Sequence, residues 1–219
     1  MGRLDALRLA MLTQTMKRAS ARRSTLEVAG LRLTVEPGVC HPSPAMGASF
    51  SPLFGAALEG MRAGERVLDL GTGCGVWALM ASRAGAEVTA TDLAHVPIEV
   101  VARAARANRV PTPRLLSGDL FEPVTGERFD RVLFNPPFHL GEPRTDEERA
   151  YFGGADGAVL RRFLRELPDH LTSDGHGYVV LPATERASYE DALVPRRPRT
   201  VASRWMPVMG TVELLALAP

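Results

Sequence analysis

The residues best suited to carry chemistry are Asn135, Pro136 and Phe138, in an Asn-Pro-Pro-Phe segment that follows the apolar run Arg131–Phe134. Proline fixes φ and donates no backbone N–H, and a residue before proline is held extended. The segment therefore predicts a rigid shelf, where the Asn135 side-chain oxygen and the Pro136 carbonyl each accept an N–H from one planar NH2 group. Phe138 would stack on that group. Such acceptors orient the nitrogen lone pair and stabilise the positive charge that grows during alkylation. A plain strand-ending turn is the alternative.

A second cluster surrounds a glycine-rich turn. Its members are Asp69, Gly71, Thr72, Gly73 and Gly75. Glycines allow a tight turn and the close approach of a ligand to the backbone. A dinucleotide site would more usually carry G-x-G-x-x-G, and an acid beside a pyrophosphate is repulsive. Asp69 suits an ammonium group, such as that of a methionine moiety.

Two more acids follow later apolar runs. Asp92 and Leu93 close one candidate strand, and Asp119 and Leu120 follow the next. Asp92 suits a pair of ribose hydroxyls. Asp119 suits an adenine amino group, with the Leu120 N–H directed at a ring nitrogen. Any one acid could be a helix cap, but three acids at successive strand ends predict one cofactor site, for a ligand with an ammonium group, a ribose and an adenine.

These clusters depend on strands and helices that alternate along the chain. Strands are predicted at Arg66–Leu70, Glu87–Asp92, Arg114–Ser117, Arg131–Phe134, Gly177–Leu181, Val201–Met206 and Thr211–Leu217. Helices are predicted at Val76–Ala84, Ile98–Asn108, Ala158–Leu171 and Ser188–Leu193. Such alternation predicts a parallel sheet covered by helices on both faces. The short gap Pro207–Gly210 permits only an antiparallel hairpin. We therefore expect an α/β, Rossmann-like fold with a seven-stranded, mostly parallel sheet and a C-terminal antiparallel hairpin.

Residues 1–50 are expected to form a small addition. A basic helix over Leu4–Ala19, whose charges we interpret as a solvated face, precedes a β-hairpin at Leu26–Val35. The loop Pro37–Ser49 would cover the substrate or cofactor. Ser51-Pro52 predicts a helix start, and with it the main domain over residues 51–219.

The residues after the shelf are expected to support it. His139 is assigned to the loop or to substrate contact rather than to a general base. The polar stretch Gly141–Ala150 predicts a mobile flap. Gly153–Gly157 would cap the next helix and approach the shelf closely.

Composition narrows the possible partners. The 219 residues carry a net charge of +1, so bulk charge indicates no polyanion partner. The cysteines, Cys40 and Cys74, do not make a disulfide framework. No apolar run is long enough to cross a bilayer, and the N-terminus lacks the apolar core of a secretion signal. We expect a cytoplasmic protein with no membrane partner and no metal.

The motifs Asp69–Gly75, Asp92, Asp119 and Asn135–Phe138 resemble those of the small-domain class I methyltransferases, over about Pro37 to Ala218. The resemblance implies the class I methyltransferase fold, S-adenosyl-L-methionine as cofactor and transfer of methyl to nitrogen. The parallel sheet with one antiparallel hairpin is the layout of that class.

Two branches of the family compete. Gly153-Gly154, Gly157 and the helix through Arg161-Arg162 are similar to HemK-type enzymes, which methylate a glutamine amide in translation release factors. Phe134–His139 and the loop beginning Pro37-Gly38-Val39 look more like the ribosomal RNA guanine-N2 enzymes, and adenine-N6 enzymes share the shelf. Phe138 departs from the tyrosine usual in the HemK type.

The expected activity is therefore N-methylation of a planar amide or exocyclic amino nitrogen, in a protein glutamine or an RNA base. A peptide or small-molecule natural product is the alternative acceptor. A nucleotide-dependent oxidoreductase and a non-catalytic partner subunit are weaker interpretations, because neither uses the shelf together with the acids.

Overall fold

The structure, a computed structural model, describes residue 18 and residues 21–40, 51–206 and 209–219. The helix expected at Leu4–Ala19 and most of the loop expected at Pro37–Ser49 lie outside these ranges. None of the helices in the described ranges is long and apolar enough to span a membrane.

The core of the molecule is a seven-stranded sheet in the order β5-β4-β3-β6-β7-β9-β8. Its strands are β3 (Arg66–Leu70), β4 (Glu87–Asp92), β5 (Arg114–Ser117), β6 (Phe129–Phe134), β7 (Leu171–Pro182), β8 (Arg199–Met206) and β9 (Gly210–Leu217). The pairs among β3 to β7 are parallel, and β9 runs antiparallel to both β7 and β8. This confirms the expected α/β fold with its C-terminal antiparallel hairpin.

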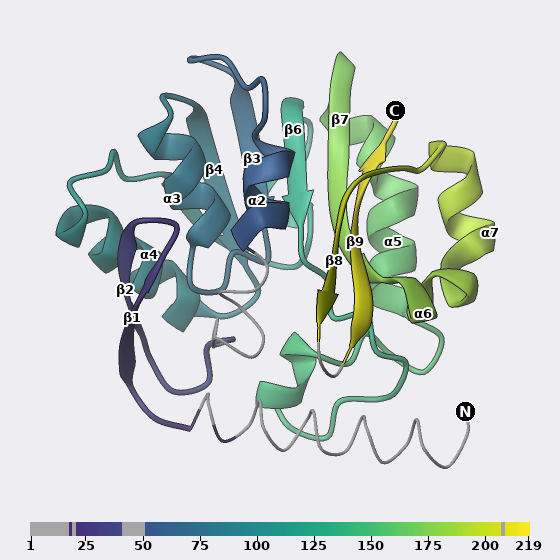
Figure 1. The fold of residues 1–219 in the computed structure, drawn as a ribbon, viewed down its shortest axis with the longest axis horizontal. Helices are drawn as coiled ribbons and strands as arrows, with labels where there is room; N and C mark the ends of the chain where they lie inside the picture. Colours follow the sequence, from purple (N-terminus) through teal and green to yellow (C-terminus); the bar gives the residue numbers. More distant parts are fainter. Residues whose placement is uncertain (1–17, 19–20, 41–50, 207–208) are drawn as a thin grey trace.

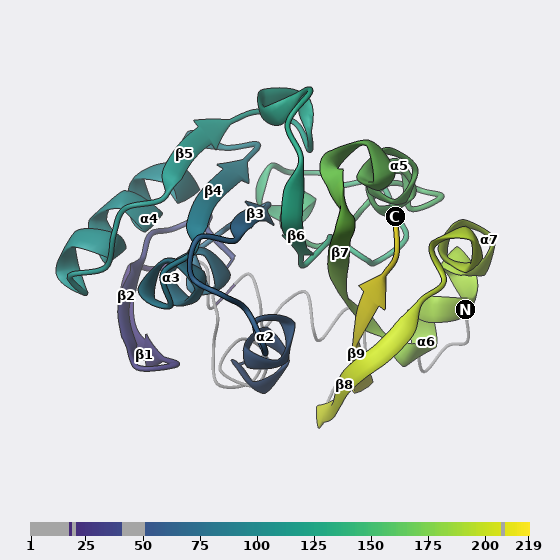
Figure 2. The same ribbon diagram turned by 90° about the horizontal axis from the view of Figure 1, so that it is seen from above.

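Helices cover both faces of the sheet (Figures 1 and 2). One face carries α2 (Ser51–Ala57), α3 (Val76–Arg83) and α4 (His95–Ala107), and the other carries α5 (Ala158–Glu166), α6 (Ala183–Arg186) and α7 (Glu190–Leu193). The short 3-10 helices are η2 (Glu122–Val124), η3 (Glu147–Ala150), η4 (Leu167–His170), η5 (Ala187–Tyr189) and η6 (Val194–Arg196). Burial on both faces explains why consecutive residues of the central strands are buried, as at Val67–Leu70 of β3, rather than every second one.

Several boundaries differ from those expected from sequence. The helix expected over Ala158–Leu171 ends as an α-helix at Glu166 and continues as η4. Pro168 accounts for the change, because it donates no N–H to the preceding turn and its ring crowds the carbonyl four residues earlier. α4 begins at His95, so that Pro97 falls in its first turn, where a missing N–H costs nothing. The helix expected at Ser188–Leu193 is divided between η5 and α7, and α6 precedes it.

The predicted N-terminal hairpin is present as β1 (Ser24–Val28) and β2 (Leu31–Val35). It packs beside α4, where the Asn108 side chain accepts from the Arg32 N–H at 2.7 Å and donates to the Arg32 carbonyl at 2.8 Å. The Arg83 side chain also donates to the Ala29 carbonyl at 2.8 Å. Leu31, Leu33 and Val35 are fully buried, so the hairpin contributes to the main core.

Gly157 precedes α5 in a left-handed conformation, with φ of 73°. A Cβ atom built there would meet the Tyr189 ring at 2.4 Å. Gly126 is also left-handed, with φ of 80°, but a Cβ there would meet nothing within 4 Å. A side chain at Gly126 would therefore cause backbone strain alone, whereas one at Gly157 would cause backbone strain and steric overlap with Tyr189.

We expect Gly126→Ala to lower the free energy of unfolding by about 1 kcal/mol, through backbone strain alone. Gly157→Ala adds an overlap with a buried ring and should cost at least ~3 kcal/mol. Urea unfolding of both variants measures the difference. Equal losses would show that Tyr189 does not restrict this position.

Candidate active site

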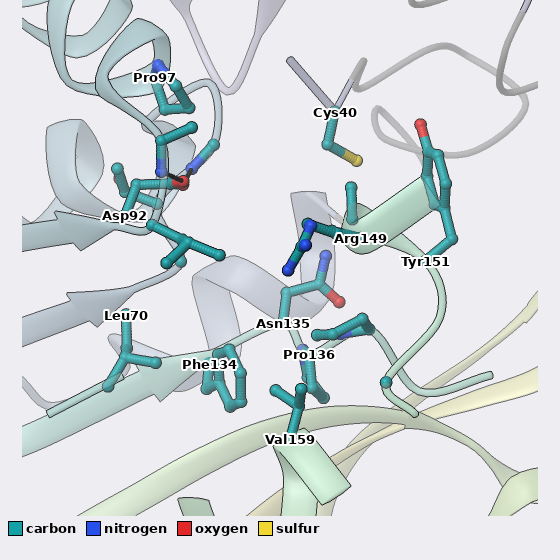
Figure 3. A pocket seen from close by; sticks show the side chains of 18 of the residues that line it. Cys40, Leu70, Asp92, Pro97, Phe134, Asn135, Pro136, Arg149, Tyr151 and Val159 are labelled. Atoms are coloured by element: carbon teal, nitrogen blue, oxygen red, sulfur yellow. Dashed lines mark hydrogen bonds between the residues drawn. The ribbon is translucent and has the colours of Figure 1, made fainter. Parts of the chain in front are cut away.

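The predicted site residues converge at the carboxyl edge of the parallel strands. Leu70 of β3 pairs with Phe134 of β6 and with Thr91 of β4, and Asp92 pairs with Ser117 of β5. A cavity of about 870 Å³ opens beyond these strand ends (Figure 3). Every site residue named from the sequence except Gly75 lines it. Its volume is near the upper end of the range for ligand pockets.

Asp69 lines this cavity and is only 3% exposed. One of its oxygens, Oδ2, accepts from the Thr72 hydroxyl at 2.7 Å and from the Ala78 N–H at 3.0 Å. Burial raises the pKa of this carboxyl to about 7, and the two hydrogen bonds oppose the shift. A cation placed beside Asp69 would offset the cost of burying its charge.

The glycines of the turn have distinct functions. Gly71 and Gly73 are left-handed, with φ of 64° and 53°, and both line the cavity. Gly75 does not line it. A Cβ at Gly75 would meet Val101 of α4 at 2.6 Å, so this glycine allows α3 and α4 to pack closely. The sequence grouped Gly75 with the ligand-facing residues, whereas the structure gives it a packing role.

Asp92 closes β4 and faces the same cavity. Its Oδ2 accepts from the Gly73 N–H at 3.0 Å, and its Oδ1 accepts from the Ala94 N–H at 3.1 Å. Burial raises the pKa of Asp92, and these backbone hydrogen bonds oppose the rise. Each oxygen keeps a second lone pair, so the carboxylate can still accept two hydroxyls. Leu93 beside it is 55% exposed and forms an apolar part of the wall.

Asp119 has a partner that the sequence did not indicate. Its two oxygens bind the terminal nitrogens of Arg162 on α5, each at 2.8 Å. This bidentate ion pair fixes the plane of the carboxylate at the edge of the cavity. Leu120 follows in a left-handed conformation, with φ of 48°. No local pattern could have paired Asp119 with a residue 43 positions away.

Asn135 stands at the end of β6, where the chain turns through Pro136 and Pro137. Its side-chain oxygen is buried and has no hydrogen-bond partner among the described residues. A buried acceptor without a partner costs about 1–3 kcal/mol. Such an atom calls for an explanation, and a donor supplied by a ligand is one that fits its place in the cavity wall.

Gly153 supports the shelf from behind. A Cβ atom on Gly153 would meet the Pro137 carbonyl oxygen at 2.3 Å, so only glycine permits this contact. The Gly153 N–H also donates to the His139 carbonyl at 2.9 Å. Gly157 occupies the position before α5. The close approach and the capping expected for Gly153–Gly157 are both present.

Phe138 and His139 complete the wall beyond the prolines. The Tyr189 hydroxyl, which is fully buried, donates to the Phe138 carbonyl at 2.9 Å. The rings of Phe138 and His139 meet edge to face, with centroids 4.7 Å apart. His139 Nδ1 lies 3.5 Å from a Glu185 oxygen, while its Nε2 is buried without a partner among the described residues. Stacking of Phe138 on an acceptor stays a prediction.

The stretch expected to form a flap closes the outer side of the cavity. It contains η3 and is joined to the segment before α5 by backbone hydrogen bonds between Gly141 and Gly154, at 2.9 and 3.1 Å. Glu142, Asp146 and Arg149 face the cavity from this side. The described beginning of the N-terminal loop, Gly38–Cys40, also lines the cavity, and the Cys40 thiol is hydrogen-bonded with the Tyr151 side chain.

Residues 51–194 match the family described as the methyltransferase small domain. This chain belongs to that family. It is 34% identical over 179 residues to the ribosomal protein uL3 glutamine methyltransferase of Bradyrhizobium diazoefficiens, an alignment that covers 74% of this chain and 56% of the relative. It is also 31% identical over 159 residues to a putative protein N5-glutamine methyltransferase of Methanocaldococcus jannaschii, covering 68% of this chain and 75% of the relative.

A solved structure agrees with the family match. The Thermus thermophilus 16S rRNA N2 G1207 methyltransferase, in complex with AdoMet and guanosine, superposes with a TM-score of 0.64 and 25% identity. The superposition covers 90% of this chain and 50% of that one. The chain thus spans about half the length of several of the proteins it matches.

The buried Asp69 predicts a dependence of stability on pH. Its pKa is raised to about 7 in the folded protein, so the folded state binds a proton that the unfolded chain releases at lower pH. The free energy of unfolding therefore falls as pH rises from about 4 to about 7, and the full penalty is present above pH 7.

Asp69→Asn should remove this penalty, because one amide oxygen can accept from both Thr72 and Ala78. We expect the variant to exceed the wild type in unfolding free energy by ~2–4 kcal/mol at pH 8, with a smaller gap at pH 5. Urea unfolding across this range measures the gap, with Asp174→Asn at an exposed site as control. A gap that does not change with pH would contradict the assignment.

Proposed function

We propose that this chain uses S-adenosyl-L-methionine to methylate the side-chain amide nitrogen of a glutamine in a protein. The observation that carries the proposal is the buried, unpartnered side-chain oxygen of Asn135 at the end of β6. Asn135 lines the same cavity as Pro136, Asp69 and Asp92.

The residues present fit the cofactor at three points. Buried Asp69 suits the ammonium of the amino-acid end, because a cation would relieve the desolvation that raises its pKa. Asp92 keeps lone pairs for both ribose hydroxyls, and the left-handed Gly71 and Gly73 let a ligand lie against the backbone. Asp119 and Leu120 line the cavity where the adenine would lie. When bound, the cofactor supplies an electrophilic methyl group on a sulfonium.

The shelf then acts by positioning. An amide nitrogen is a poor nucleophile because its lone pair is delocalised. Asn135 Oδ1 and the Pro136 carbonyl would each accept one of its N–H groups and turn the nitrogen toward the cavity. Both acceptors would also stabilise positive charge on that nitrogen. Orientation and charge stabilisation together serve such a reaction without a strong base.

Charge within the cavity favours a protein acceptor. Among the described residues, the charged side chains lining it are Asp69, Asp92, Asp119, Glu142, Asp146 and Arg149. Carboxylates therefore dominate, although Arg162 neutralises Asp119. A polyanion such as RNA binds through clustered cations, whereas beyond the three acids assigned to the cofactor the wall carries Glu142 and Asp146 against Arg149. The names of both relatives, glutamine methyltransferases, support the same choice.

The exocyclic N2 of guanine in RNA is the second candidate. The Phe134–His139 segment and the likeness to the 16S rRNA guanine enzyme favour it. A peptide or small natural product presents the same planar NH2 and would use the same shelf. A nucleotide-dependent oxidoreductase and a non-catalytic subunit are disfavoured by the family match. We place the activity in the cytoplasm, in keeping with the free thiols of Cys40 and Cys74.

Incubation of the purified protein with methyl-labelled cofactor and fractionated cell contents tests the acceptor. We expect label in the protein fraction, and acid hydrolysis of that fraction to release labelled methylamine, as an N-methylated amide does. Label confined to deproteinised RNA would show that the methyl acceptor is an RNA base and not a protein glutamine. Label confined to small molecules would indicate a natural-product acceptor.

Asn135→Ala should lower kcat by roughly 100- to 1000-fold, because one charge-stabilising acceptor is lost. Its dissociation constant for S-adenosylhomocysteine should stay within about twofold of wild type. Asp92→Ala should act on affinity first. It should weaken the binding of S-adenosylhomocysteine by roughly 10- to 100-fold, because two hydrogen bonds to the Asp92 carboxylate are lost. Calorimetry and single-turnover kinetics separate the two effects. An unchanged rate in Asn135→Ala would remove this residue from the mechanism.

A further inference from the structure

Arg149 is the one lysine or arginine that lines the cavity within the described ranges. It belongs to η3, on the flap side, and lies above the Asn135 amide with its guanidinium directed into the cavity (Figure 3). The shelf chemistry proposed above makes no use of this cation. An Arg at this position therefore needs a partner of its own.

The recorded partner of Arg149 inside the protein is weak. Its Nε lies 3.1 Å from Asp146 Oδ1, and the two side chains are 59% and 98% exposed. A solvent-exposed pair of this kind holds its members loosely. No hydrogen bond is recorded from the terminal nitrogens of Arg149 to another described residue. These two nitrogens form the fork that binds carboxylates in a bidentate manner.

Arg149 lies near the glycine-rich turn, as its position relative to Cys40 shows. Cys40 lies on the same side of the cavity as Arg149, where its thiol is hydrogen-bonded with the Tyr151 side chain (Figure 3). A Cβ at Gly73 would be 4.0 Å from the Cys40 Cβ, so Cys40 packs over the turn that follows Asp69. Arg149 therefore reaches into the part of the cavity between this turn and Asn135.

The amino-acid end of the cofactor carries an ammonium and a carboxylate on the same carbon atom. Protein groups that bind these two charges must therefore face the same region. Asp69 provides an anion for the ammonium, and a carboxylate beside it must find a cation or remain unpaired. Within the described residues, the cavity offers Arg149.

We propose that Arg149 binds the carboxylate of the amino-acid end of S-adenosyl-L-methionine. The inference rests on the proposed function, since it takes that cofactor as the ligand. A planar guanidinium matches a carboxylate with two parallel N–H···O hydrogen bonds. Because Arg149 belongs to the flap, this contact ties the outer wall of the cavity to the bound cofactor.

Calorimetric binding of S-adenosylhomocysteine tests the inference without measuring turnover. Arg149→Met keeps the length of the side chain and removes the charge, and should weaken binding by roughly 10- to 100-fold. Arg149→Lys, a point charge without the fork, should fall between the variant and wild type. Arg144→Met makes the same change on an exposed flap residue that does not line the cavity, and should bind like wild type.

A second ligand isolates the carboxylate. The decarboxylated analogue of S-adenosylhomocysteine should bind wild type and Arg149→Met with equal affinity. If Arg149→Met binds S-adenosylhomocysteine as tightly as wild type, the inference is wrong and the proposed function stands. If the variant loses affinity for both ligands equally, Arg149 supports the wall and does not bind the carboxylate, which also overturns the inference. If wild type binds neither ligand, the proposed function itself fails.

Discussion

The site depends on the register of the parallel strands. Pairing of Leu70 with Phe134 and with Thr91, and of Asp92 with Ser117, makes four strands end along one edge. Residues that leave these ends then face one another, although up to about seventy positions separate them in the chain. Side chains alternate between the faces of a strand, so a slip of one residue in β3 would exchange the faces of Asp69 and its apolar neighbours. The apolar residues that fill both faces of the central strands oppose such a slip, and in this way the core fixes the geometry of the cavity.

Unfavourable interactions collect at this edge. Asp69 is buried with a raised pKa, and the unpartnered side-chain atoms buried in the described residues include one from Asn135 and one from His139. Elsewhere the core is apolar and closely packed, so the cost is local and the rest of the fold offsets it. Each of these groups would gain from a ligand of suitable charge or hydrogen-bonding capacity. When a ligand binds, it relieves the unfavourable free energy of these groups, and this relief adds to the affinity for the ligand.

Local sequence patterns were enough to predict the strands and the glycine-rich turn, because each of these is fixed by neighbours in the chain. Contacts between distant segments were not predictable in this way. The Asp119–Arg162 ion pair and the hydrogen bond from Tyr189 to the Phe138 carbonyl join residues 43 and 51 positions apart, and neither has a spacing that marks it. Gly75 shows the same limit, because its type was recognised but its packing against Val101 depends on where α4 lies. Pro168, by contrast, is a local signal for the end of α5 that the pattern of apolar residues had masked.

Rigidity is distributed unevenly around the cavity. Three independent contacts hold the shelf: its own prolines, the packing of Gly153 against the Pro137 carbonyl, and the Tyr189 hydrogen bond to the Phe138 carbonyl. The flap facing it is joined to the segment before α5 by the Gly141–Gly154 hydrogen bonds, and its Asp146 and Arg149 side chains are mostly exposed. Chemistry that works by orienting a weak nucleophile needs its acceptors fixed, since a displacement of about 1 Å costs much of the rate. Entry and exit of ligands need the opposite property in at least one wall. The firmly held Asn135–Phe138 segment on the sheet side and the exposed charges on the flap side would meet both demands of the proposed reaction within one cavity.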